Sequence, residues 1–134
     1  MLTKATDITT QLEDRPGTLA KLTDTISKAG VNIDGFCGSA DMGNTFHFLF
    51  ISDPVGGRKA LERAGAKVKK EREVILVDVQ DRPGAAAAEF HKVAQQELNV
   101  DLVYLATDNR IVIGGDELPK IREALSMETT KVKV

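Results

Sequence analysis

The sequence predicts an α+β protein made of two ferredoxin-like βαββαβ modules, each with a four-stranded antiparallel sheet and its helices on one face. The main observation is the tetrapeptide Asp-Arg-Pro-Gly, which occurs at Asp14–Gly17 and again, 67 residues later, at Asp81–Gly84. Each copy lies between a strand-like and a helix-like stretch. The same interval relates Asn32–Asp34 to Asn99–Asp101. We interpret the chain as a duplication, with modules at residues 1–71 and 72–134.

The first half has the element order strand, helix, strand, strand, helix, strand. Pro16 and Pro54 favour a first helical turn, and Gly30 occupies the usual position just past a helix end. Apolar side chains at Leu19, Leu22 and Ile26 share one face of the first helix. The predicted ranges are Asp7–Leu12, Pro16–Ala29, Val31–Ser39, Thr45–Ile51, Pro54–Ala64 and Lys67–Glu71.

The second half repeats this order of elements. Its predicted ranges are Glu73–Val79, Pro83–Glu97, Val100–Ala106, Arg110–Ile113, Asp116–Met127 and Lys131–Val134. The most apolar runs, Phe46–Ile51 and Val74–Val77, are typical of central strands, whereas the lysine-rich Lys67–Lys70 and Lys131–Val134 indicate exposed edges. Ile8–Leu12 is unusually polar for the central strand that this topology requires.

Composition restricts the classes of function. The net charge of −2 argues against a nucleic-acid-binding surface, and the single cysteine, Cys37, excludes an internal disulfide and a cysteine-based metal cluster. Apolar runs such as Phe48–Ile51 are too short to cross a bilayer, and no charged-then-apolar leader precedes Thr3, so we expect a cytoplasmic protein that does not bind membranes. We expect no cofactor and no metal. His47 and His91 are interpreted as a packing residue and a solvated residue.

The repeated turn is the candidate binding site. Asp14 is expected to accept hydrogen bonds from the free N–H groups of the helix, and Gly17 leaves those groups accessible from above. A helix N-terminus with open donors suits a carboxylate. Asn32 and Asn99 can offer both a donor and an acceptor to an amine or a carboxylate. The alternatives stay open: the turn could only cap the helix, the asparagines could only anchor a loop, and the duplication could serve stability alone.

Both stretches resemble the ACT domain family, the small βαββαβ modules that sense amino acids. They are DRPGTLAKLTDTISKAGVNID at Asp14–Asp34 and DRPGAAAAEFHKVAQQELNVD at Asp81–Asp101, and the second is especially similar to the regulatory tails of aspartokinases. The resemblance covers nearly the whole chain and leaves no room for a catalytic domain. It therefore implies a non-catalytic tandem protein that binds a free amino acid, or a similar small carboxylate-bearing metabolite, and regulates an enzyme or regulator partner.

In this family, effectors bind where two modules meet, between the strand–helix turn of one module and the second strand of its neighbour. Carried over by position, the resemblance implies the ligand-binding residues Asp14, Arg15, Gly17, Thr18, Asn32, Ile33, Asp81, Arg82, Gly84, Ala85, Asn99 and Val100. A chain without an output domain must signal through self-association or through a separate partner, and a small exposed edge on a short chain favours a homodimer. The alternative is a regulatory subunit or co-regulator whose modules mainly mediate protein association without a working ligand site.

Two other functions use the same fold. An RNA-recognition module would place aromatic side chains on its third strand, where Phe46, Phe48 and Phe50 alternate. The matching strand of the second half has no aromatic residue, so we expect these side chains to face the helices as core. An acylphosphatase-like hydrolase would use an arginine such as Arg15, but the glycine-rich signature of that family is absent. We therefore expect no catalysis.

Overall fold

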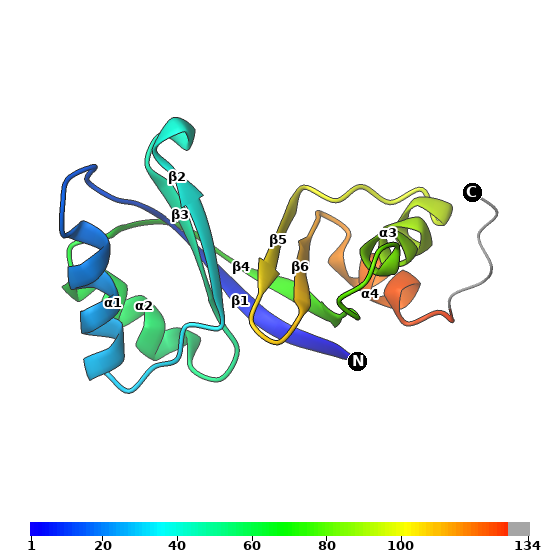
Figure 1. The fold of residues 1–134 in the computed structure, drawn as a ribbon, viewed down its shortest axis with the longest axis horizontal. Helices are drawn as coiled ribbons and strands as arrows, with labels where there is room; N and C mark the ends of the chain where they lie inside the picture. Colours follow the sequence, from blue (N-terminus) through cyan, green and yellow to red (C-terminus); the bar gives the residue numbers. More distant parts are fainter. Residues whose placement is uncertain (129–134) are drawn as a thin grey trace. The chain divides into compact units, whose positions relative to one another are not determined.

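The computed structural model describes residues 1–128, in which six β-strands, four α-helices and one short 3₁₀ helix occur (Figure 1). The strands are β1 (Leu2–Gln11), β2 (Gly35–Ser39), β3 (Thr45–Phe50), β4 (Lys67–Asp78), β5 (Leu102–Ala106) and β6 (Arg110–Gly114). The helices are α1 (Thr18–Lys28), α2 (Pro54–Arg63), α3 (Ala85–Gln95) and α4 (Leu118–Leu125), with η1 (Ala40–Met42) as the 3₁₀ turn. The fold class is α+β, as predicted.

The described strands form one six-stranded sheet in the order β2-β3-β1-β4-β6-β5, in place of two separate four-stranded sheets. The pairs β1–β3, β2–β3, β4–β6 and β5–β6 are antiparallel. The two edge strands of this order are therefore β2 and β5, the second predicted strand of each half.

The chain divides into two compact units. The N-terminal unit is Ala5–Glu73, and the C-terminal unit combines Met1–Lys4 with the chain from Val74 onward. In the C-terminal unit, the backbone N–H of Asp78 donates to the carbonyl of Met1 (3.3 Å), and Leu2 packs against the unit's core. The start of β1 thus supplies a strand segment to the C-terminal unit. The predicted strand at Lys131–Val134 lies outside the described residues.

The strands predicted at Lys67–Glu71 and Glu73–Val79 are one continuous strand, β4. The predicted break at Arg72 is wrong because no glycine, proline or other turn-forming residue interrupts the run Glu71–Glu73. Strand β4 lies between β1 and β6 in the sheet order. Its pairing with β6 is confined to Ile75–Asp78, however, so the lysine-rich half of β4 does not pair with β6.

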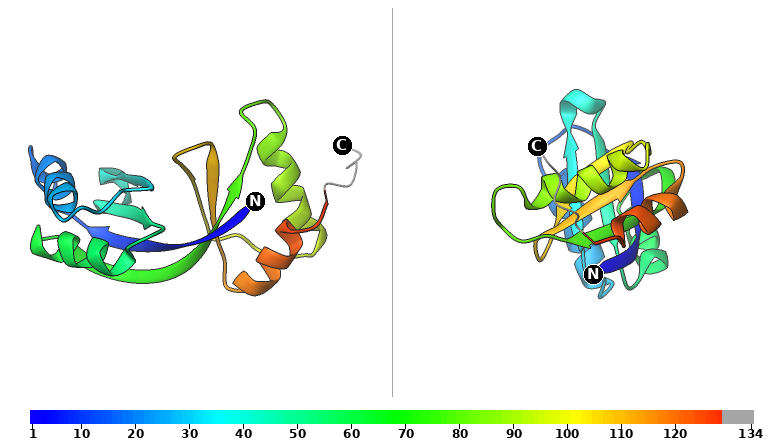
Figure 2. Two further views of the ribbon diagram at one scale, coloured as in Figure 1. Left: turned by 90° about the horizontal axis from the view of Figure 1, so that it is seen from below. Right: turned by 90° about the vertical axis from the view of Figure 1, so that its right-hand side faces the viewer.

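The core of the N-terminal unit lies between its strands and the pair α1 and α2, which lie side by side (Figure 2). Phe48 and Phe50 from β3 pack with Leu22 and Ile26 of α1 and with Leu61 of α2. Phe46 packs against the same cluster. This arrangement confirms that the phenylalanines of β3 are core residues and removes the basis for an RNA-stacking surface.

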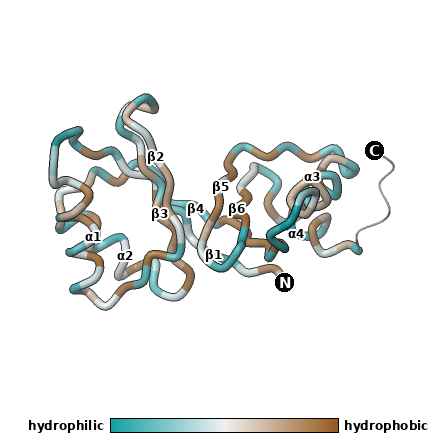
Figure 3. Tube along the Cα trace, viewed as in Figure 1, coloured by the Kyte–Doolittle hydropathy of each residue, from teal (hydrophilic) through white to brown (hydrophobic). Residues whose placement is uncertain are grey.

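The C-terminal unit has an equivalent core. Ile75 and Val77 of β4 and Ile111 and Ile113 of β6 pack with apolar residues of α3 and α4, among them Val93. Strand β6 is one of the most hydrophobic stretches of the chain, coloured brown in Figure 3. Among the helices of residues 1–128, none combines the length and the apolar character needed to cross a membrane.

Candidate functional site

The first Asp-Arg-Pro-Gly turn joins β1 to α1. Gly17 is the N-cap residue of α1, with a φ of 87° in the left-handed region that glycine adopts without steric cost. The helix begins after this glycine, at Thr18, and not at Pro16 as predicted. No side-chain hydrogen bond caps α1, and Asp14 is exposed. The prediction that Asp14 caps the helix is wrong, because the left-handed glycine turns the chain first and leaves Asp14 outside the first turn.

A surface cavity of about 310 Å³, which we call the α1 cavity, lies beside this turn. It is lined by residues 12–13, 15–18 and 21–22, and by Ala64–Ala66 of the loop between α2 and β4. A second cavity of about 200 Å³ lies against the same turn and is lined in part by Asp14, Ala40, Asn44 and Phe46. The turn therefore borders hollow surface within a single unit. Arg15, Gly17 and Thr18 line both cavities.

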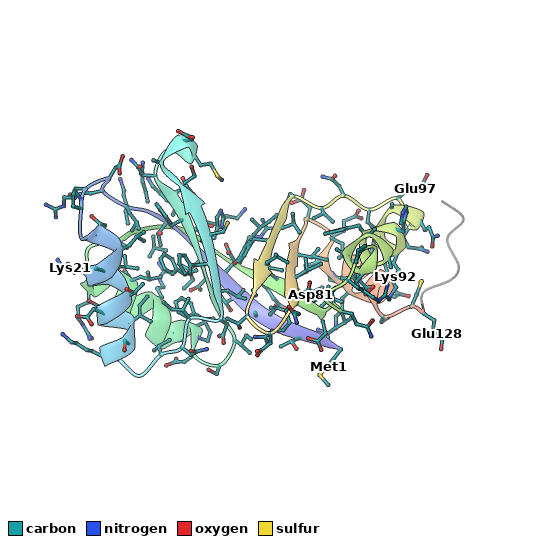
Figure 4. The ribbon with its side chains drawn as sticks, in the orientation of Figure 1. Met1, Lys21, Asp81, Lys92, Glu97 and Glu128 are labelled. Carbon is teal, nitrogen blue, oxygen red and sulfur yellow. The ribbon has the colours of Figure 1, made fainter. Side chains whose placement is uncertain are left out.

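The polar groups of the α1 cavity differ in how far they are already satisfied. Arg15 Nε lies 2.9 Å from Glu13 Oε2, and both side chains are exposed. Lys21, labelled on α1 in Figure 4, is exposed and makes no side-chain hydrogen bond or ion pair with any described residue. The Oγ1 of Thr18 is buried and has no hydrogen-bond partner within residues 1–128. The cavity thus holds one unneutralised cation and one unsatisfied hydroxyl.

Asn32 does not join this site within the N-terminal unit. It follows α1, whose eleven residues separate it from the turn by about 16 Å at 1.5 Å per residue. Its Nδ2 donates to Asp34 Oδ1 (2.8 Å), and Asp34 Oδ2 accepts from the N–H of Ile51 (2.8 Å). Ile33 packs against the core. The Asn-Ile-Asp motif therefore anchors the loop into β2, the structural alternative that the sequence left open.

The second turn repeats the backbone of the first. Gly84 is the N-cap of α3 with the same φ of 87°, again without a side-chain cap, and Asp81 is exposed. Arg82 Nε donates to Gln80 Oε1 (2.7 Å). A cavity of about 290 Å³, the α3 cavity, is lined by residues 78–80, 82, 85, 88–89 and 92. Asn99 and Val100 lie past the other end of α3, where Val100 packs against the core.

The sequence reasoning missed Glu13, Lys21 and the loop Ala64–Ala66. Lys21 could have been found from spacing, because residues three or four apart share a helix face and Lys21 is three residues after Thr18. The loop residues carry no such signal, since their place beside the turn depends on how α1 packs on α2. Among the described residues, no group of three or more His, Cys, Asp or Glu side chains could hold a metal ion.

Several solved structures share this arrangement of elements. The protein BT0572 from Bacteroides thetaiotaomicron superposes with a TM-score of 0.71 and 25% identity, over 93% of this chain and 87% of that one. The regulatory subunit of aspartate kinase from Thermus thermophilus superposes with a TM-score of 0.62 and 18% identity, over 93% of both chains. The fold is ACT-like. Aspartate kinase from Clostridium acetobutylicum carries the same ACT-like fold (TM-score 0.64, 10% identity), with 92% of this chain matching 32% of that enzyme.

No protein-family model and no curated protein matches the sequence. At these identities the two aspartate kinase structures establish the fold alone. The ACT-like fold of this chain is shared with structures described as a regulatory subunit and a putative regulatory domain of aspartate kinase.

Proposed function

We propose that this chain is a non-catalytic regulatory protein that binds a free amino acid, or a similar small carboxylate-bearing metabolite, and acts as a sensor. The observation that carries the proposal is the α1 cavity. Its volume of about 310 Å³ suits a small metabolite, and it lies against a helix start that no side chain caps. Lys21 and the hydroxyl of Thr18 provide further groups that a carboxylate would satisfy.

The mechanism follows from differential binding. A ligand can shift an equilibrium between two arrangements of the protein only by the difference in its affinity for them. A ligand that contacts both the turn and the loop Ala64–Ala66 would favour the arrangement in which these segments stand at the observed spacing. As a non-catalytic sensor, the chain would pass its response to another protein or to a second molecule of itself.

The exposed edge strands support association of two copies. Val103 and Leu105 of β5 are 50% and 72% exposed, and Phe36 of β2 is 50% exposed. Each is an apolar side chain on an edge strand of the sheet formed by the described residues, where a second chain can pack. We therefore retain a homodimer as part of the proposal.

A second candidate is a separate regulatory subunit that acts mainly by holding an enzyme. The observation that favours it is the match over 93% of both chains to a protein described as the regulatory subunit of an aspartate kinase. The same exposed strands would then contact the enzyme, and the cavities would not need to bind a ligand.

A thermal-shift screen of the twenty amino acids tests the first candidate against the second. A ligand that binds the folded state raises the melting temperature in proportion to the logarithm of its concentration above its dissociation constant. We expect at least one amino acid to raise it in a concentration-dependent manner. If none does at millimolar concentration, the sensor proposal is wrong and the subunit candidate replaces it.

A further inference from the structure

The α1 and α3 cavities are related by the duplication but differ in the residues that give them charge. The 67-residue interval of the repeat carries Thr18 to Ala85, Lys21 to Ala88 and Leu22 to Glu89. All six side chains line their respective cavities. The backbone of the two turns is the same, with Gly17 and Gly84 both at a φ of 87°. The two linings also differ in one segment, because the loop Ala64–Ala66 borders the α1 cavity and no equivalent loop within residues 1–128 borders the α3 cavity.

The α1 cavity has an excess of positive charge. Arg15 and Lys21 are cationic and Glu13 is anionic, and Glu13 is already paired with Arg15 at 2.9 Å. Lys21 is left as the unneutralised charge, at the start of a helix whose partial positive charge adds to it. The hydroxyl of Thr18 is buried and lacks a partner among the described residues, and it could donate to a bound acceptor once the side chain turns toward the cavity. Each of these features favours an anion.

The four charged side chains that line the α3 cavity, Asp78, Arg82, Glu89 and Lys92, carry no net charge. Alanine replaces both the threonine and the lysine, so neither a hydroxyl nor a free ammonium group is present at those positions. Glu89 is 9% exposed, and its Oε2 lies 2.9 Å from Lys92 Nζ. The positive charge of Lys92, which is labelled on α3 in Figure 4, is therefore neutralised by the carboxylate of Glu89. Asp78 and Arg82 complete the charged lining: Asp78 Oδ2 lies 3.7 Å from the N-terminal ammonium group of Met1, and Arg82 Nε donates to Gln80 Oε1 (2.7 Å).

We propose that the α1 cavity is the ligand site of the chain and that it selects a small acid with net negative charge, such as an acidic amino acid or a simple dicarboxylate. The α3 cavity does not bind this ligand. The inference rests on the proposed function. It adds the charge of the ligand and states which of the two cavities binds it. A cationic amino acid is rejected, because it would bring a second ammonium group to Lys21.

The test is calorimetric titration of the full chain with L-glutamate and with L-glutamine, two ligands of nearly equal shape that differ by one negative charge. L-aspartate, succinate and L-lysine complete the series. We expect one glutamate per chain. Glutamine should bind about tenfold more weakly or worse, as the loss of one charge-assisted hydrogen bond implies, and lysine should not bind.

Three variants assign the site. Lys21→Met keeps the aliphatic stem and should weaken glutamate binding by about tenfold, with little effect on glutamine. Thr18→Ala introduces the residue that the second half of the chain has at the equivalent position, Ala85, and should also weaken glutamate binding. Lys28→Met, at the far end of α1 where Lys28 pairs with Asp24 at 3.3 Å, is the matched control and should not change it.

The outcomes separate this inference from the proposed function. If glutamine or lysine binds as tightly as glutamate, and Lys21→Met has no effect, the inference is overturned while the sensor proposal stands. If Lys92→Met weakens glutamate binding and Lys21→Met does not, the ligand binds in the α3 cavity and the assignment to the α1 cavity is wrong. If no acid and no amino acid of any charge binds, both proposals fail.

Discussion

Asp7 Oδ2 lies 3.0 Å from His47 Nδ1 across the pair β1–β3. The carboxylate is fully buried, and the Oγ1 of Thr9 also donates to it at 3.2 Å. His47 stands directly opposite Thr9 in the register of the two strands, so its ring reaches Asp7 diagonally. A buried carboxylate is tolerated only when hydrogen bonds replace its lost water. The contact with His47 therefore allows β1, which carries the buried Asp7, to lie in the centre of the sheet.

We expect His47→Ala to destabilise the N-terminal unit by about 1–3 kcal/mol, because Asp7 stays buried and loses one of its hydrogen-bond partners. Urea denaturation followed by circular dichroism measures the change. Asp24→Ala is the matched control, since it removes an exposed ion pair with Lys28 (3.3 Å) that contributes little. Equal midpoints for His47→Ala and the parent protein would show that the Asp7–His47 contact adds no stability.

The glycines of the repeated turns should tolerate asparagine but not alanine. Gly17 and Gly84 both have a φ of 87°, and a Cβ added at either would meet no atom within 4 Å. Backbone conformation, not space, is therefore what requires glycine. We expect Gly17→Ala to cost about 1–2 kcal/mol in free energy of unfolding and Gly17→Asn to cost less, because asparagine populates the left-handed region more readily. If both variants lose the same stability, the left-handed conformation is not the cause.

Much of the fold could be predicted because its signals are local. The alternation of Phe46, Phe48 and Phe50 identified a core face, and the paired Asp-Arg-Pro-Gly turns identified the starts of α1 and α3. The polar character of β1 could not be resolved in this way. The buried Thr10 donates its Oγ1 to the carbonyl of Phe46 at 2.9 Å, and that partner is 36 residues away. A side chain that looks unsatisfied in the sequence is satisfied by a strand that only the tertiary fold brings beside it.

The candidate site was predictable to a similar degree. The turn residues Arg15, Gly17 and Thr18 do line hollow surface, because a strand–helix turn is a local feature. The grouping of Asn32 with them was not obtained within one unit, since the two ends of a helix cannot meet. The family resemblance places that asparagine against a neighbouring module, and this placement stays a prediction.

The thiol of Cys37 should ionise only at high pH. Burial raises the pKa of Cys37 above its ordinary value, and the negative charge of Asp7 raises the pKa further. The thiolate is thus disfavoured in the folded state, so this group lowers stability as the pH rises above the pKa of the unfolded thiol. Alkylation by iodoacetamide, followed against pH, should show a higher midpoint for the native protein than for the protein in urea. A shared midpoint would contradict the effect of burial, and Asp7→Asn should lower the native value alone.

Leu105 should contribute to association of the protein. Its side chain is 72% exposed on the edge strand β5, and Leu105→Lys would place a charge where a second copy is expected to pack. We expect sedimentation velocity to show a concentration-dependent dimer for the parent protein and a monomer for this variant. Val55→Lys, on α2, changes an aliphatic side chain that is 64% exposed away from the strand edge and should leave the dimer intact. Identical sedimentation of both variants would rule out β5 as the contact.

Leu2 should stabilise the C-terminal unit although it lies at the opposite end of the chain. It packs against the core formed by Ile75, Val77 and their neighbours, and the adjacent Met1 carbonyl accepts from the N–H of Asp78 at 3.3 Å. Removing part of a partly buried leucine side chain costs about 1–2 kcal/mol, less than at a fully buried site. We therefore expect Leu2→Ala to accelerate amide hydrogen exchange in β6 more than in β3, whereas Thr3→Ala should change neither. Faster exchange confined to β3 would mean that the start of β1 serves the N-terminal unit instead.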